Sequence, residues 1–253
     1  MEDSLTVPLN VCNLYNNKFI IPKNCKKLWF DIGTSINSPN GVQFLKRNKN
    51  GFVIGFEPNP QMYFTIYSMY YINQNKWLVD NNHSTALIEK NKRIKNQKRQ
   101  IFNDTEEFIN KNDFMNRYII IPCAISLNDG FEKLYKHNHE GSSSLNDSWN
   151  NINTNEYIYV KTFPLKKFID MVPEYINFIE HVKIDCEGHD LNVIKSAGES
   201  INRIAVITCE DRNCDTYLLN KNFSFLEEQN GGFSFINNNY KNLLSELDYF
   251  IRV

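Results

Sequence analysis

Short apolar runs alternate with stretches of helical periodicity along most of this chain. The runs have the length and composition of buried strands, and each ends at residues that favour turns. Strands that alternate with helices predict an α/β fold, in which a mostly parallel sheet carries helices on both faces. The expected strands lie at about 27–33, 52–57, 118–125, 179–185 and 203–210.

Helices are expected between these strands. One should follow Pro39, and Pro60 is suited to the first turn of the next, where a missing N–H loses no hydrogen bond. Shorter helices are expected over 164–172 and from Asp190 to about Gly198. We interpret the apolar face of the helix after Pro60 as core packing rather than as a ligand site. This face is formed by Met62, Tyr63, Ile66, Met69 and Tyr70.

The segment between the second and third strands is much longer than one crossover helix requires. Residues 80–117 are therefore expected to be an insertion within a single domain that spans 1–253 and has its motif-bearing core at about 27–211. The centre of the insertion, 90–99, carries six positive charges. We interpret it as a solvated run; the alternative is a basic flap over an anionic substrate or nucleic acid.

Antiparallel strands are expected in the second half of the chain. Asn-Asp-Gly at 128–130 is a hairpin signal, so 131–135 should return as a short strand, and 157–163 is a further β-rich run. Alternating aromatic residues over 223–235, followed by the apolar end at 249–253, predict antiparallel strands that close the sheet.

Composition indicates one globular domain without a strong overall charge. The chain has 253 residues, of which 42% are hydrophobic, and a formal net charge of −1, so a packed core is expected and global attraction to nucleic acid is not. Its acidic start lacks the pattern of a signal peptide, and no apolar run reaches the roughly 18–20 residues of a membrane span. The six cysteines form no C-x-x-C pair. We therefore expect a reduced, cytoplasmic protein with no membrane partner and no zinc site.

Two of the expected strands end in a carboxylate at the point where the chain turns. Asp31 closes the first strand, and the turn after it contains Gly33 and small hydroxyl residues. Glu57 closes the second strand, 24 residues beyond Gly33, a spacing at which an acidic residue meets a ribose in nucleotide-binding βαβ units. Small residues admit a nucleoside to the backbone, and a carboxylate accepts hydrogen bonds from a vicinal diol. The two strand ends therefore predict a site for a nucleoside cofactor.

The first turn differs from the dinucleotide fingerprint G-x-G-x-x-G. Asp31 stands where a pyrophosphate would require N–H groups and no competing negative charge. An acid at this point suits a cationic or zwitterionic ligand. S-adenosylmethionine has a sulfonium and an amino-acid tail but no phosphate, so it is predicted in preference to NAD. The alternative is that Asp31 caps the next helix and Glu57 lies on the surface.

Further charged residues follow the fourth strand. Lys183 and Asp185 lie on one face of it, where charges are costly unless they are paired or functional. Asp185 or Glu187 is suited to accept the proton of a substrate hydroxyl or to orient that hydroxyl, and Lys183 to keep Asp185 charged or to bind substrate. The alternative is a purely structural Lys183–Asp185 pair. We interpret His189 as a surface residue, with a second general base as the alternative.

These segments resemble the FkbM-type methyltransferases, a class I S-adenosylmethionine-dependent family. The F-E-P-N-P block at 56–60 and the K-I-D-C-E-G block at 183–188 are specific in combination. D-I-G-T-S-I-N at 31–37, A-I-S-L-N-D-G at 124–130 and the small-residue loop at 141–145 stand in the family's order and spacing. The resemblance covers roughly 27–211.

The resemblance implies a seven-stranded, Rossmann-like class I methyltransferase fold and methylation of hydroxyl groups. One departure is Asn37, which stands where the family has its second motif glycine and adds bulk near the methionine tail. The resemblance implies active-site roles for Asp185 and Glu187, beside which we place Lys183. The cofactor contacts that we predict on this basis are Asp31, Gly33, Thr34, Ser35, Asn37, Glu57, Pro58, Asn59, Cys123, Ala124 and Ile125.

The leading hypothesis is an S-adenosylmethionine-dependent O-methyltransferase that acts on a sugar, glycan or small-molecule hydroxyl by direct SN2 transfer. An RNA ribose 2′-O-methyltransferase, with 90–99 tracking phosphates, is less favoured because the net charge is −1. A metal-assisted variant would hold Mg²⁺ between Asp185 and Glu210 or Asp211. A non-catalytic protein that binds a partner or the cofactor is the remaining alternative.

Overall fold

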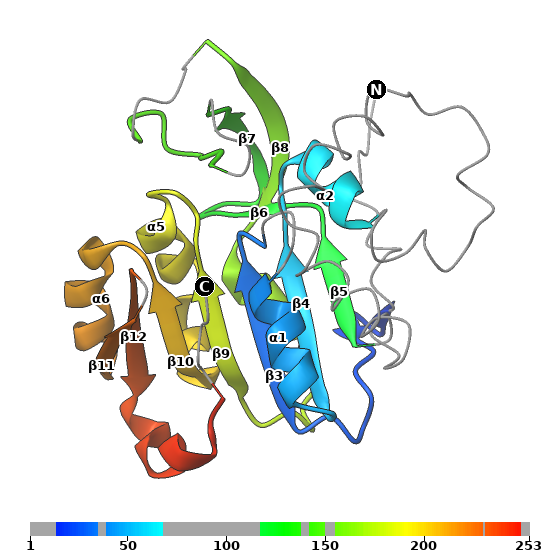
Figure 1. Cartoon of the computed structure of the whole chain (residues 1–253), viewed down its shortest axis with the longest axis vertical. Coiled ribbons are helices and arrows are strands. Elements are labelled where there is room, and N and C mark those ends of the chain that lie inside the picture. The colour runs from blue at the N-terminus through cyan, green and yellow to red at the C-terminus, as the bar shows by residue number, and fades with distance from the viewer. Residues whose placement is uncertain are drawn as a thin grey trace.

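The centre of the protein is a sheet of seven strands in the order β11-β12-β10-β9-β3-β4-β5 (Figure 1). The computed structural model describes residues 14–34, 39–67, 117–137, 142–149, 155–229 and 231–248. Neighbouring strands from β10 to β5 run parallel, whereas β12 is antiparallel to both β10 and β11. The seven strands are β3 Lys27–Ile32, β4 Gly51–Phe56, β5 Tyr118–Ile121, β9 Ile179–Ile184, β10 Ile204–Cys209, β11 Phe223–Gln229 and β12 Gly232–Asn237.

This arrangement confirms the predicted α/β, Rossmann-like fold with a mostly parallel sheet and an antiparallel C-terminal strand. From β3 the chain builds outward through β4 and β5, and it then returns to the other side of β3 with β9 and β10. The order therefore reverses between β3 and β9. Open α/β sheets bind ligands at such a switch point, outside the carboxyl ends of the strands.

The two faces of the sheet are covered by different helices because side chains alternate along each strand. Leu28, Phe30 and Ile32 of β3 belong to a large core with side chains of α4, α5 and α6. Trp29 points to the opposite face, where it stacks on Phe44 of α1 with ring centroids 4.3 Å apart. The helices are α1 Pro39–Arg47, α2 Pro60–Tyr67, α4 Leu165–Met171, α5 Asp190–Lys195 and α6 Asp215–Asn220, with 3-10 helices η4 Gly198–Arg203, η5 Arg212–Cys214 and η6 Asn238–Glu246.

The expected helices are present, with boundaries shifted by one or a few residues. Pro60 opens α2 as predicted, and Met62, Tyr63 and Ile66 are buried. The rest of the expected apolar face, Met69 and Tyr70, and most of the expected insertion at 80–117 lie outside the described residues. None of the helices in the described part of the chain is both long and apolar enough to cross a membrane.

A second, smaller sheet of three strands stands above the carboxyl ends of the main sheet (Figure 1). It contains β6 Ala124–Ile125, β7 Gly130–Tyr135 and β8 Tyr157–Phe163, while β1 Leu14–Tyr15 and β2 Lys18–Phe19 form a separate hairpin. The expected strand at 118–125 is thus divided between two sheets, because Pro122 has no N–H for a ladder. The short strand predicted after the turn at 128–130 is confirmed as β7, but the hairpin is wrong, because β7 pairs with β8 and not with β6.

A buried polar chain crosses the main sheet through His181. Its Nε2 lies 2.9 Å from Oγ1 of Thr208 on β10, and that hydroxyl lies 2.8 Å from Oγ of Ser234 on β12. The ring also meets Trp29 edge-on, with centroids 4.4 Å apart. Burial lowers the pKa of His181 from its ordinary 6.5 to about 3. The folded protein therefore holds this imidazole neutral, whereas the unfolded chain protonates it below about pH 6.5.

We predict that His181→Phe removes part of the acid sensitivity of the fold. The lowered pKa means that the unfolded state binds one more proton, so the wild type loses about 1.4 kcal/mol of unfolding free energy per pH unit as pH falls from 6 towards 3. Phe keeps a planar ring and cannot titrate, and Thr208 retains its contact with Ser234. Urea unfolding at pH 7, 6 and 5 should show the gap between the two proteins closing at lower pH; parallel curves would contradict this prediction.

Candidate active site

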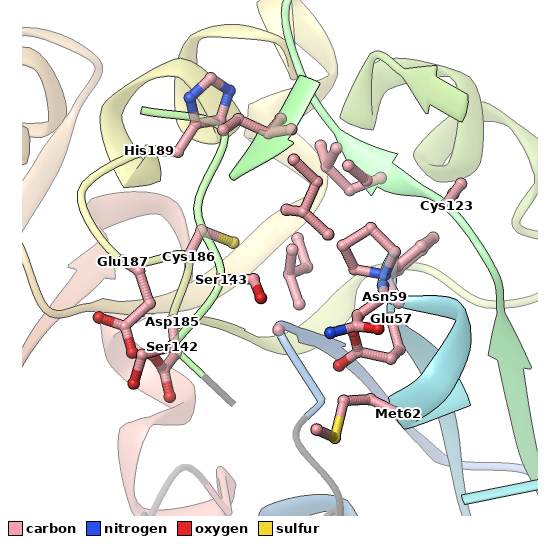
Figure 2. A pocket seen from close by; sticks show the side chains of 18 residues that line it. Glu57, Asn59, Met62, Cys123, Ser142, Ser143, Asp185, Cys186, Glu187 and His189 are labelled. Carbon is pink, nitrogen blue, oxygen red and sulfur yellow. Dashed lines mark hydrogen bonds between the residues drawn. The ribbon is translucent and has the colours of Figure 1, made fainter. Parts of the chain in front are cut away.

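A cavity of about 270 Å³ opens where β3, β4, β5 and β9 end, beneath the small sheet (Figure 2). It brings together most of the predicted site residues although they come from four strand ends. Figure 2 shows Glu57, Asn59 and Met62 on one side and Asp185 and Glu187 on the other. The predicted residues that line it are Gly33, Glu57, Pro58, Asn59, Cys123, Ala124, Ile125, Asp185 and Glu187.

The turn after β3 requires Gly33. Its φ of +76° is a left-handed conformation, and a Cβ at this position would lie 1.9 Å from the backbone oxygen of Asp185. The hydroxyl of Thr34 donates to the backbone oxygen of Asp31 at 2.9 Å, so it stabilises the turn and does not line the cavity. Ser35 and Asn37, also predicted to contact the cofactor, lie outside the described residues.

The turn after β4 holds the carboxylate of Glu57 in place. Glu57 is buried, and its Oε1 accepts the N–H of Asn59 at 2.8 Å. The side-chain oxygen of Asn59 in turn accepts the N–H of Gln61 at 3.0 Å, in the first turn of α2. The F-E-P-N-P block therefore ends a strand, fixes the acid and starts a helix within a few residues. The alternative in which Glu57 lies on the surface is wrong.

Lys183 forms a buried charge cluster below the cavity. Its Nζ lies 3.0 Å from Oδ2 of Asp185 and 3.7 Å from Oδ1 of Asp31, and it donates to the backbone oxygen of Gly33 at 3.0 Å. Burial alone would lower the pKa of Lys183, but Asp31 and Asp185 outweigh it and raise the pKa above its ordinary value. Lys183 is therefore charged.

Neither Asp31 nor Lys183 is among the residues that line the cavity, and both are almost fully buried. Asp31 also accepts the phenol hydroxyl of Tyr118 at 3.2 Å. The cofactor contact of Asp31 and the substrate contact of Lys183 therefore stay predictions. What the structure shows is that both residues join the end of β3 to the end of β9. Asp185, whose side chain is 29% exposed, is the member of the cluster that reaches the cavity.

His189 is part of the cavity wall, so its interpretation as a surface residue is wrong. The side chain is buried, and Nε2 lies 3.2 Å from Oγ of Ser126. Burial lowers the pKa of His189, which keeps the imidazole neutral. Cys186 lines the same wall, and burial raises the pKa of its thiol well above the usual value, so it is no thiolate nucleophile.

Several carboxylates lie close together just after the ends of β9 and β10. Asp190 accepts the N–H of Cys186 at 3.0 Å and that of Glu210 at 2.8 Å, so it joins two strand ends as well as starting α5. Burial raises the pKa of Asp190 to about 6. Loss of solvation at the carboxyl group, followed by the charge of Asp185, raises the pKa of Glu210 to about 7, although the residue as a whole is exposed. Within the described ranges, no group of three or more acidic, His or Cys side chains is arranged to hold a metal ion.

The family model for the Methyltransferase FkbM domain matches residues 31–247, which is most of the chain. This chain belongs to the FkbM methyltransferase family. A solved structure described as Methyltransferase FkbM from Methylobacillus flagellatus KT is similar over 84% of this chain, with 14% sequence identity and a TM-score of 0.45. The chain spans 44% of that protein's length. None of the curated proteins matches it.

Part of the cavity wall was not predicted from sequence. Leu134 comes from β7, and Ser142, Ser143 and Leu145 come from the small-residue loop between β7 and β8. The loop is one of the motifs that carry the resemblance, but its composition alone assigns no role. The small sheet, which stands over the carboxyl ends of the main-sheet strands, brings these side chains to the cavity.

We predict that Gly33→Ala destabilises the protein far more than Gly231→Ala. Both glycines have φ near +80°, but a Cβ on Gly231 would meet no atom within 4 Å, whereas one on Gly33 would collide with β9. Gly231→Ala should cost about 1 kcal/mol of unfolding free energy, and Gly33→Ala at least about 2 kcal/mol more. Chemical denaturation measures both, and equal losses would rule out the tight approach of β3 to β9.

Proposed function

We propose that this protein is an S-adenosylmethionine-dependent O-methyltransferase. The observation that carries the proposal is the charge of the cavity. Three carboxylates line it, from Glu57, Asp185 and Glu187, and no Lys or Arg occurs among the described lining residues. A dinucleotide or other phosphate-bearing ligand would meet repulsion there, whereas a cationic sulfonium with an ammonium group would be attracted.

The residues present fit this cofactor. Glu57 has the acceptor oxygens that a ribose diol requires, and its fixed carboxylate loses little conformational freedom on binding. Pro58, Met62 and the 123–125 segment provide an apolar wall suited to an adenine ring. Gly33 lines the cavity near the ends of β3 and β9, where the methionine portion would lie. S-adenosylmethionine, when bound, supplies an electrophilic methyl group.

The opposite wall is suited to a hydroxyl acceptor. The carboxylates of Asp185 and Glu187 accept hydrogen bonds only, so they bind groups that carry a proton to donate. One of them would orient the hydroxyl and take its proton as the hydroxyl oxygen becomes methylated. Lys183 donates a hydrogen bond to Asp185 from below the cavity, at 3.0 Å. We propose a sugar, glycan or other small hydroxyl compound as the acceptor, since a described wall without cations offers no site for a nucleic-acid phosphate.

Cofactor binding is tested by Glu57→Ala in isothermal titration calorimetry with S-adenosylmethionine. Loss of hydrogen bonds to a charged acceptor should weaken binding about 10- to 100-fold. Glu57→Gln, which keeps one acceptor oxygen, should lie between Ala and the wild type. Glu156→Ala removes an exposed carboxylate that does not line the cavity and should change nothing. No heat of binding with folded wild-type protein would refute the proposed function.

Proton acceptance is tested by Asp185→Asn in a methyl-transfer assay with radiolabelled cofactor and a set of neutral hydroxyl acceptors. Asn still offers an oxygen to Lys183, so the fold should persist, but it cannot take a proton. We expect kcat to fall about 10²- to 10⁴-fold while cofactor affinity changes little. Turnover within a few-fold of the wild type would exclude Asp185 as the essential base.

A further inference from the structure

The loop 142–149 is fastened to the turn that carries Glu187. The hydroxyl of Ser144 donates to the backbone oxygen of Glu187 at 2.6 Å, and Nδ2 of Asn146 lies 3.3 Å from the backbone oxygen of Gly188. Ser144 also exchanges two backbone hydrogen bonds with Tyr135 of β7. The small sheet thereby anchors the loop, and the loop holds the turn.

The turn itself requires such support. Glu187 has φ +52°, a left-handed conformation that costs a residue with a side chain about 1–3 kcal/mol and persists only where the surroundings impose it. Gly188 follows with φ +83°. These two angles turn the chain so that the Glu187 side chain lies beside Asp185 on one side of the cavity (Figure 2).

Trp149 completes this arrangement through two contacts. Its six-membered ring lies against Gly188 so closely that a Cβ there would be 2.2 Å from Cε3. Its indole Nε1 donates to Oε2 of Glu187 at 2.8 Å. Among the described residues, Oε1 of the same carboxylate accepts no hydrogen bond. The indole thus fixes one oxygen of Glu187 and leaves the other for a ligand.

We propose that Trp149 is a positioning residue, which holds the Glu187 carboxylate so that its second oxygen receives the acceptor hydroxyl. The inference rests on the proposed methyl transfer and adds a residue outside the recognised motifs. Trp149 donates a single hydrogen bond from a rigid ring, so it fixes the carboxylate without competing for the acceptor. The loop 142–149 would then serve the reaction by placing this indole beside Glu187.

The experiment compares the full-length wild type, Trp149→Phe, Glu187→Gln and the double variant. Phe keeps a ring over Gly188 and removes the N–H, so the thermal midpoint should change little. Asp147→Asn is the matched control, because this exposed loop carboxylate forms no side-chain hydrogen bond or ion pair with any described residue. Calorimetry with S-adenosylhomocysteine measures cofactor affinity. Methyl-transfer assays with methyl glycosides, polyols and phenols measure turnover of the acceptor.

We expect S-adenosylhomocysteine affinity within twofold of the wild type for every variant. Trp149→Phe should lower kcat at least tenfold at unchanged KM for S-adenosylmethionine, and the double variant should be no slower than Glu187→Gln alone. Tryptophan emission should shift in Glu187→Gln but show no such shift when Trp149 is already Phe.

Three results would each overturn the inference alone. In the first, Trp149→Phe keeps kcat within twofold of the wild type. In the second, the losses multiply in the double variant, and in the third, the emission spectrum does not respond to Glu187→Gln. Failure of the wild type to bind S-adenosylhomocysteine or to methylate any acceptor would instead overturn the proposed function beneath it. If Trp149→Phe does not fold, Ser144→Ala is the second variant, because it removes the hydrogen bond to the backbone of Glu187 in the same turn. It should reproduce the kcat loss. Normal turnover of Ser144→Ala would refute the positioning role.

Discussion

The buried ammonium of Lys183 joins the two strand ends on which the site depends. Asp31 ends one side of the topological switch point and Asp185 the other, and Lys183 lies between them while it also binds the backbone of Gly33. A charge this deeply buried is tolerable only when partners surround it, and loss of Lys183 would leave Asp31 and Asp185 without their shared cation. The contacts of Lys183 with Asp31 and Asp185 therefore hold the ends of β3 and β9 together at the floor of the cavity.

Two further constraints shape the walls above that floor. Gly33 allows β3 to approach β9 without a side chain between them, and the left-handed turn at Glu187 and Gly188 turns a carboxylate towards the opening. On the other side, the strand-to-helix junction at 56–60 fixes Glu57. The cavity thus has one acid on one wall and two on the other, and under the proposed function these would bind the nucleoside and the acceptor hydroxyl.

Features set by local sequence were predictable. Strand ends such as Glu57 and Asp185 follow from apolar runs that stop at turn residues, and Pro60 marks a helix start by its missing N–H. Features set by contacts distant in sequence were not. The burial of His189 depends on Ser126, 63 positions away, and the Trp149–Glu187 contact spans 38 positions. The hairpin signal at 128–130 likewise misled, because β7 forms hydrogen bonds along its whole length with β8, whereas β6 is only two residues long.

We propose that one cavity holds a phosphate-free adenosyl cofactor between Glu57 and the pair of Asp185 and Glu187. A crystal structure of the protein with S-adenosylhomocysteine would show whether it does. We expect ribose hydroxyls within hydrogen-bond distance of Glu57, adenine against Pro58 and the 123–125 segment, and the sulfur facing Asp185 and Glu187. A nucleoside bound elsewhere, or a sulfur turned away from these two carboxylates, would contradict it.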